Sequence, residues 1–169
     1  NLNKWHQHRI SKLITKKLFG TLSGKKIAVL GFAFKKNTND TRESAAIQIC
    51  KDLLDEGAIL YIHDPKVDPD QIAFDLNQKP QNSNLSRCEE QTLVEESKWY
   101  STSDIEIALE GSDAAVILTE WMDYSQINWN KTARKMRKPA WVFDARSIVD
   151  PKSVIKSGLN FWRIGDGVL

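Results

Sequence analysis

GKKIAVLGFAFKKNTNDTRE, residues 24–43, is the stretch that decides the fold. Its continuous apolar run at residues 27–34 predicts a buried central strand of a parallel sheet. A sharp turn at Gly31 and a polar, basic loop then lead to the start of a helix, and α/β proteins bind phosphorylated ligands at such junctions. Only the first glycine of the dinucleotide fingerprint G-x-G-x-x-G is present. The stretch therefore predicts a nucleotide-like site that is not an obvious dinucleotide site.

Further short apolar segments continue the alternation of strand and helix. We expect α/β architecture, with a Rossmann-like, mostly parallel sheet and helices on both faces. Ligands on such sheets bind beyond the carboxyl ends of the strands, where the strand order switches. The other expected strands are residues 59–63, 99–101, 114–119, 141–143 and 161–164.

The helices between these strands are expected from their caps and apolar faces. Asp40 or Thr41 can cap the helix that carries Cys50, and Gly57 should end it. An S-x-x-E capping box at residues 103–106 predicts a second helix. Further helical segments are expected at residues 124–136 and 151–156.

An amphipathic helix is expected ahead of the first strand, over residues 3–19. Its apolar stripe, left exposed, should drive self-association. We expect residues 1–20 to be the end of a linker helix and residues 21–169 to form the nucleotide-binding domain, with a polar surface insertion at about 67–98. The stripe consists of Ile10, Leu13, Ile14 and Leu18.

Composition narrows the class of protein. The 169 residues carry a net charge of +2, which suggests neither nucleic acid nor an anionic membrane as a partner. No apolar run approaches the roughly 20 residues of a membrane-spanning helix. Cys50 and Cys88 form no metal-binding pattern with the histidines, so we expect no metal and two unpaired thiols in a reducing cytoplasm.

Charged residues near the expected strand ends are the candidates for ligand binding. Lys35 or Lys36 can reach a phosphate at the helix N-terminus, although both lysines could equally be solvated. Arg42 opposes the helix dipole, which hints at an anionic partner, yet a salt bridge with Asp40 or Glu43 is the favoured interpretation from the residues alone.

Two later segments offer similar chemistry. The T-E-W segment at residues 119–121 brings a carboxylate and a ring that stacks on a base or, by default, packs in the core. Arg146 presents a fork suited to phosphate or sugar oxygens, or else pairs with Asp144. Asp64 is expected to form an Asp-Pro turn. No nucleophile and base pair is visible, so the residues indicate a binding module.

Four motifs occur in an order and spacing that closely resemble the C-terminal, UDP-binding domain of the UDP-glucose 6-dehydrogenase family. The family oxidises UDP-glucose to UDP-glucuronate in two NAD-dependent steps through a catalytic cysteine. Neither its G-G-x-C-x-x-K-D type motif nor its NAD-binding domain is found here, so the resemblance implies no catalytic residue in this fragment and no activity from it alone. The motifs are GFAFKKNTNDTRES at 31–44, HDP at 63–65, TEW at 119–121 and FDAR at 143–146.

The resemblance also assigns residues. Phe34, Lys35 and Arg146 match contacts to the UDP-sugar, which would be UDP-glucose or UDP itself. Arg42 matches an arginine that reaches toward NAD, which reverses the preference for a salt bridge. Residues 1–20 match the end of the central, dimer-forming helix. Two alternatives remain open: a dehydrogenase for UDP-N-acetylmannosamine or GDP-mannose, and a free-standing nucleotide-binding or oligomerisation module.

Overall fold

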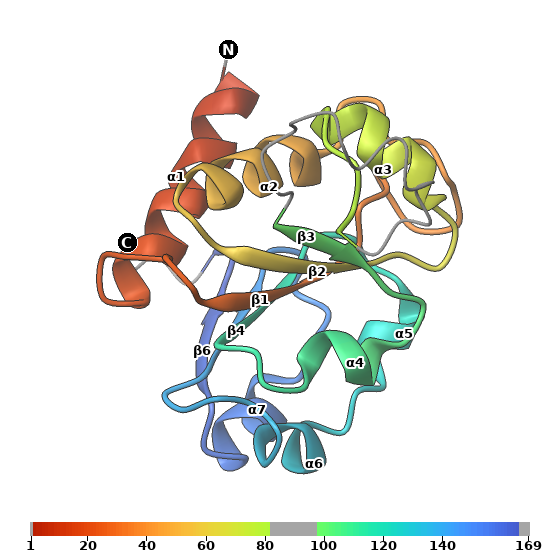
Figure 1. Cartoon of the computed structure of the whole chain (residues 1–169). Coiled ribbons are helices and arrows are strands. Elements are labelled where there is room, and N and C mark those ends of the chain that lie inside the picture. The colour runs from red at the N-terminus through yellow and green to blue at the C-terminus, as the bar shows by residue number, and fades with distance from the viewer. Residues whose placement is uncertain (1, 82–97, 166–169) are drawn as a thin grey trace.

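A six-stranded, all-parallel sheet forms the centre of the molecule, as a computed structural model describes it for residues 2–81 and 98–165. The strand order is β3-β2-β1-β4-β5-β6 (Figure 1), which is the doubly wound order of dinucleotide-binding folds. The α/β prediction is therefore confirmed. The strands are β1 (Lys26–Leu30), β2 (Ile59–His63), β3 (Trp99–Ser101), β4 (Ala114–Ile117), β5 (Trp141–Asp144) and β6 (Asn160–Arg163).

Helices cover both faces of this sheet. In Figure 1, α1, α2 and α3 lie on one face, and α4, α6 and α7 lie on the other. The central strands β1 and β4 are buried on both sides, which explains why they read as continuous apolar runs. The helices are α1 (Leu2–Lys17), α2 (Ala45–Asp55), α3 (Pro69–Leu76), α4 (Ile105–Leu109), α5 (Met122–Ser125), α6 (Trp129–Ala133) and α7 (Pro151–Lys156).

The prediction of a single helix at residues 124–136 is wrong. Two short helices, α5 and α6, form in this region instead. Tyr124 and Trp129 are both buried. Five residues apart, they would point in different directions on one continuous helix. The Asn128 side chain accepts a hydrogen bond from the Lys131 backbone N–H and so starts α6 separately.

Two helix caps also differ from expectation. Ser44 caps α2, since its hydroxyl accepts from the Ala46 N–H and donates to the Phe32 carbonyl. The predicted caps Asp40 and Thr41 lie earlier in the loop. Asp104 caps α4 and takes the place of the expected capping box at residues 103–106.

The apolar stripe of α1 is not exposed, so the expectation of an open stripe is wrong, while self-association through this helix stays a prediction. Leu13, Ile14 and Leu18 are buried in the core, where α1 packs beside α2. Among the side chains described from residue 5 onward, the large apolar ones that are exposed at the two ends of this segment are those of Trp5 and Phe19.

The predicted insertion at residues 67–98 contains α3, which confirms a short helix there. Cys88 and the rest of the insertion, residues 82–97, lie outside the described residues. Across residues 2–81 and 98–165, no helix has both the length and the apolar character needed to cross a membrane.

Candidate functional site

The strand order switches between β1 and β4, and the loops at their carboxyl ends meet there. Gly31 leaves β1 with a φ of +99°, a conformation that favours glycine. A Cβ at this position would lie 2.5 Å from the Cβ of Thr119. The Thr119 hydroxyl donates to the Ala33 carbonyl at 2.8 Å, so the two loops are held in direct contact.

Asp64 follows β2, and its side chain binds the loop after β1 rather than facing solvent. Its Oδ2 accepts hydrogen bonds from the backbone N–H groups of Phe32 and Ala33 at 2.8 and 2.9 Å, and from the Trp121 indole at 3.1 Å. Its Oδ1 accepts from two further N–H groups in its own turn. The predicted turn role of Asp64 is confirmed. Trp121 is buried, which confirms the default expectation of a core position.

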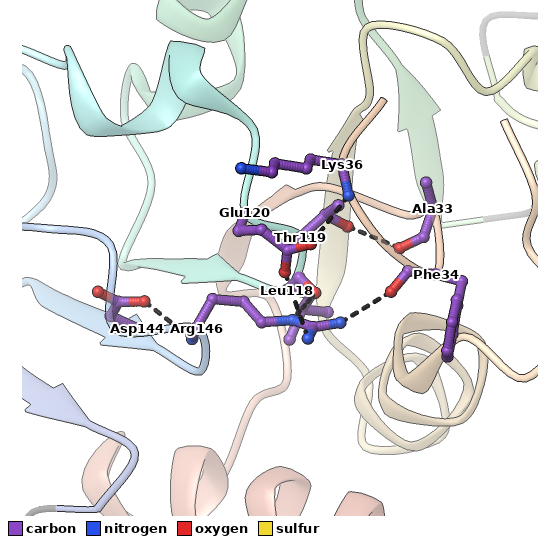
Figure 2. A network of polar contacts seen from close by, with 8 residues as sticks. All are labelled: Ala33, Phe34, Lys36, Leu118, Thr119, Glu120, Asp144 and Arg146. Carbon is purple, nitrogen blue, oxygen red and sulfur yellow. Dashed lines mark hydrogen bonds and ion pairs between the residues drawn. The ribbon is translucent and has the colours of Figure 1, made fainter. Parts of the chain in front are cut away.

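Arg146, which follows β5, joins three loops through its guanidinium (Figure 2). Its Nε donates to the Leu118 carbonyl at 2.9 Å and its Nη2 donates to the Phe34 carbonyl at 2.9 Å. Its Nη1 lies 3.3 Å from Oε2 of Glu120. Asp144 accepts from the backbone N–H of Arg146, so the expected side-chain pair between Asp144 and Arg146 is wrong.

The Arg146 guanidinium is well placed to bind an anion. Its side chain is 33% exposed. Among the described residues, its contacts with Leu118, Phe34 and Glu120 use at most three of its five N–H groups, which leaves donors for a ligand. The fork geometry suits the paired oxygens of a phosphate.

Glu120 was not assigned a role from the sequence, although it stands in the T-E-W segment. Its Oε1 accepts from the Lys36 backbone N–H at 2.9 Å, while its Oε2 faces Arg146. The partners lie 84 and 26 residues away, and no local signal in a single sequence reveals such a pairing.

The structure places the other predicted contacts on the same loop. Phe34 is 44% exposed, and the side chains of Lys35 and Lys36 are exposed as well. The backbone carbonyl of Phe34 contacts Arg146 directly. The loop that contacts the guanidinium therefore carries one exposed aromatic ring and two exposed cations, at the edge where α/β sheets bind ligands.

Arg42 lies farther along this loop and pairs with Asp40. Its Nε and Nη2 donate to the two carboxylate oxygens at 3.0 and 2.9 Å. The pair lowers the pKa of Asp40 to about 2, mainly through the hydrogen bond from Arg42. The Arg42 side chain is 88% exposed, so the salt bridge favoured from the residues alone is present at the surface.

In the part of the chain that the structure describes, neither a cysteine nucleophile nor a metal centre accompanies this network. Cys50 is fully buried, and burial raises the pKa of its thiol, which keeps it protonated and unreactive. Within residues 2–81 and 98–165, no group of three or more His, Cys, Asp or Glu side chains could hold a metal ion.

A hollow of about 470 Å³ lies between α1 and α2, away from this network. Its lining includes His8, Gly20 and Glu56. Gly20 precedes β1 and Glu56 precedes β2, so the hollow opens near the amino ends of these strands. Ligands of parallel sheets bind at the opposite edge, so we place the candidate site at the carboxyl edge.

Comparison with known proteins shows the family of this chain. The sequence profile of the UDP-glucose/GDP-mannose dehydrogenase family, UDP binding domain, matches residues 28–151. The chain belongs to this family. The match includes all the loops of the site, from Gly31 to Arg146, and identifies the chain as the UDP-binding domain of a nucleotide-sugar dehydrogenase.

Two curated relatives show the extent of the likeness. The chain is 39% identical to UDP-glucose 6-dehydrogenase of Drosophila melanogaster over 98% of its own length, and 43% identical to that of Pongo abelii over 89%. It spans about one third of these relatives, 33% and 29% of their lengths. The domain therefore corresponds to a minor part of a larger dehydrogenase.

A solved structure supports the fold independently. NDP-N-acetyl-D-galactosaminuronic acid dehydrogenase from Methanosarcina mazei Go1 aligns with 96% of this chain and 29% of its own, with a TM-score of 0.68. Sequence identity is 23%, so this likeness concerns the fold alone.

Proposed function

We propose that this chain is the UDP-sugar-binding domain of an NAD-dependent UDP-glucose 6-dehydrogenase, which converts UDP-glucose to UDP-glucuronate. The observation that carries the proposal is the anchoring of the Arg146 guanidinium to the backbone carbonyl of Phe34, the residue before Lys35, at the carboxyl edge of the sheet. The relatives that are 39% and 43% identical to the chain over the aligned residues are named UDP-glucose 6-dehydrogenase.

In this proposal the domain binds substrate and does not carry out the chemistry. Arg146 binds a phosphate of UDP through its fork, Lys35 adds a second positive charge, and Phe34 supplies an apolar surface. The catalytic cysteine and most of the NAD site would belong to other parts of the full enzyme. We expect the chain alone to form no NADH from UDP-glucose and NAD.

The first loop of this domain does not suit NAD. The second and third glycines of the fingerprint are absent, and Asp64 already binds the N–H groups of Phe32 and Ala33. The Asp64 carboxylate is therefore not free to hold ribose hydroxyls. Arg42 is the residue that would reach a cofactor held elsewhere, because its guanidinium stands at the surface.

Residues 1–20 would be the end of the central helix, and association with a second copy would use the outer side of α1. This proposal rests on the resemblance. Among the described apolar side chains at the ends of this segment, Trp5 and Phe19 are the ones exposed for such a contact.

Calorimetric titration of UDP, UDP-glucose, GDP and NAD into the chain tests the proposed function. We expect UDP to bind, with binding lost in Lys35→Ala and Arg146→Ala. Lys156→Ala, an exposed lysine on α7, is the matched control and should bind UDP normally. Binding of NAD without UDP would contradict the proposal. A preference for GDP over UDP would favour the alternative of a GDP-mannose dehydrogenase, which the family also includes.

A further inference from the structure

We propose that Glu120 is a positioning residue, which ties the segment 34–36 to Arg146 so that both reach the same anionic ligand. The inference rests on the proposed function as far as the ligand is concerned. The tie itself is a property of the free protein and can be tested without any nucleotide.

The geometry of Glu120 carries this inference. One carboxylate oxygen accepts from the Lys36 backbone N–H at 2.9 Å, and the other lies 3.3 Å from Nη1 of Arg146. Figure 2 shows the carboxylate between these two partners, which come from the loops after β1 and β5. Glu120 itself comes from the loop after β4, so a single side chain links three loops.

Neighbouring contacts explain why the link matters for the segment 34–36. The Ala33 carbonyl is held by Thr119 and the Phe34 carbonyl by Arg146. Farther along the segment, the Lys36 N–H donates to Glu120, which belongs to the loop after β4. Lys35 therefore lies between two fixed points, and Glu120 provides the second one.

Charge alone predicts the opposite outcome from positioning. A carboxylate beside Arg146 opposes the approach of a phosphate, so its removal should strengthen anion binding if charge dominates. If positioning dominates, removal frees the loop that carries Phe34 and Lys35 and weakens binding. The hydrogen bond from the Lys36 N–H to Glu120 at 2.9 Å favours positioning, because a loop that is ordered before binding costs less entropy on binding.

Two variants separate these roles. Glu120→Gln keeps an oxygen that can accept from the Lys36 N–H but removes the negative charge. Glu120→Ala removes both. Glu110→Ala is the control, because it deletes an exposed carboxylate at the end of α4, near the amino edge of the sheet. Circular dichroism and urea unfolding would confirm that all variants are folded.

We expect Glu120→Ala to raise the Kd for UDP about tenfold, the size expected from one hydrogen bond to a charged group. Glu120→Gln should restore the Kd to within about threefold of the parent value, since it keeps the hydrogen bond. Hydrogen exchange of the Lys36 amide, measured by NMR without nucleotide, should accelerate in Glu120→Ala and stay slow in Glu120→Gln.

Other outcomes would overturn the inference. If Glu120→Ala binds UDP as tightly as the parent or more tightly, charge outweighs positioning. If the Lys36 amide exchanges at the parent rate in Glu120→Ala, the tie does not order the segment. If the parent chain binds no UDP while the exchange results hold, the proposed function fails and the positioning role of Glu120 in the loop stands.

Discussion

Arg146 and Arg42 are both arginines of the same ligand-binding edge, yet they are held in contrasting ways. Arg146 contacts the Leu118 and Phe34 carbonyls and the Glu120 carboxylate, all distant in sequence. Arg42 pairs with Asp40, two residues away, and its side chain is 88% exposed. A guanidinium fixed from several loops is preorganised for a ligand, whereas one held by an exposed local pair can exchange that partner at little cost.

This contrast suggests different roles for the two arginines. The Arg146 region is built as part of the fold, so a ligand meets donors that are already in place. The Arg42 region can reorient toward a group outside the domain, as the resemblance to the dehydrogenase family implies. Four substitutions test the contrast.

Gly31→Ala should have the largest effect, because it attacks the frame of the Arg146 region. The added Cβ would overlap Thr119, and alanine disfavours the φ of +99°. We expect the free energy of unfolding to fall by about 3 kcal/mol or more, from backbone strain and overpacking together. Urea unfolding measures this loss. A loss below about 1 kcal/mol would show that the loops can separate without much cost.

Arg146→Lys should have an intermediate effect, since it keeps the charge but removes the fork. We expect UDP binding to weaken at least tenfold, on the scale of one charged hydrogen bond or more. The matched variant Arg42→Lys should leave UDP binding unchanged. Calorimetry compares the two, and equal losses would refute the contrast between the two arginines.

Arg42→Ala should have the smallest effect, with no measurable change in the urea midpoint, because the pair is exposed. The local change appears in titration. The pKa of Asp40 should rise from about 2 toward its ordinary value of 3.8. In the parent chain the lowered pKa contributes stability that is present above pH 3.8 and lost as the pH falls toward 2. At this exposed pair the contribution is too small to move the urea midpoint, and it should vanish in Arg42→Ala. NMR titration of the Asp40 carboxyl carbon follows the pKa, and an unchanged value would mean that Arg42 is not its cause.

The strands were predictable because a parallel sheet buried on both faces demands apolar runs, such as the one that forms β4. The boundaries of the helices were harder to predict from the sequence. Ser44 replaced Asp40 as the cap of α2 because several polar residues in one loop can all cap, and tertiary contacts decide among them. The buried stripe of α1 shows the same limit, since an amphipathic face does not reveal which surface it covers.

The site could be anticipated only in part. Lys35, Arg42 and Arg146 were candidates from their positions in the sequence, and the family resemblance added Phe34 and gave each residue a role. The structure places all four on two adjoining loops of one edge. Whether they bind UDP and NAD stays a prediction. Glu120 received no role from the sequence, because its role depends on two partners that only the folded chain brings together.

The hydrogen bonds of Asp64 also determine how the loop after β1 is held when no ligand is bound. Nucleotide folds commonly leave the amides of their first turn waiting for the phosphates of a bound molecule. Here the Asp64 carboxylate, which is part of the chain itself, accepts hydrogen bonds from the amides of Phe32 and Ala33. The protein therefore holds this turn by its own contacts, and nucleotide supply need not govern whether newly made chains reach their native state.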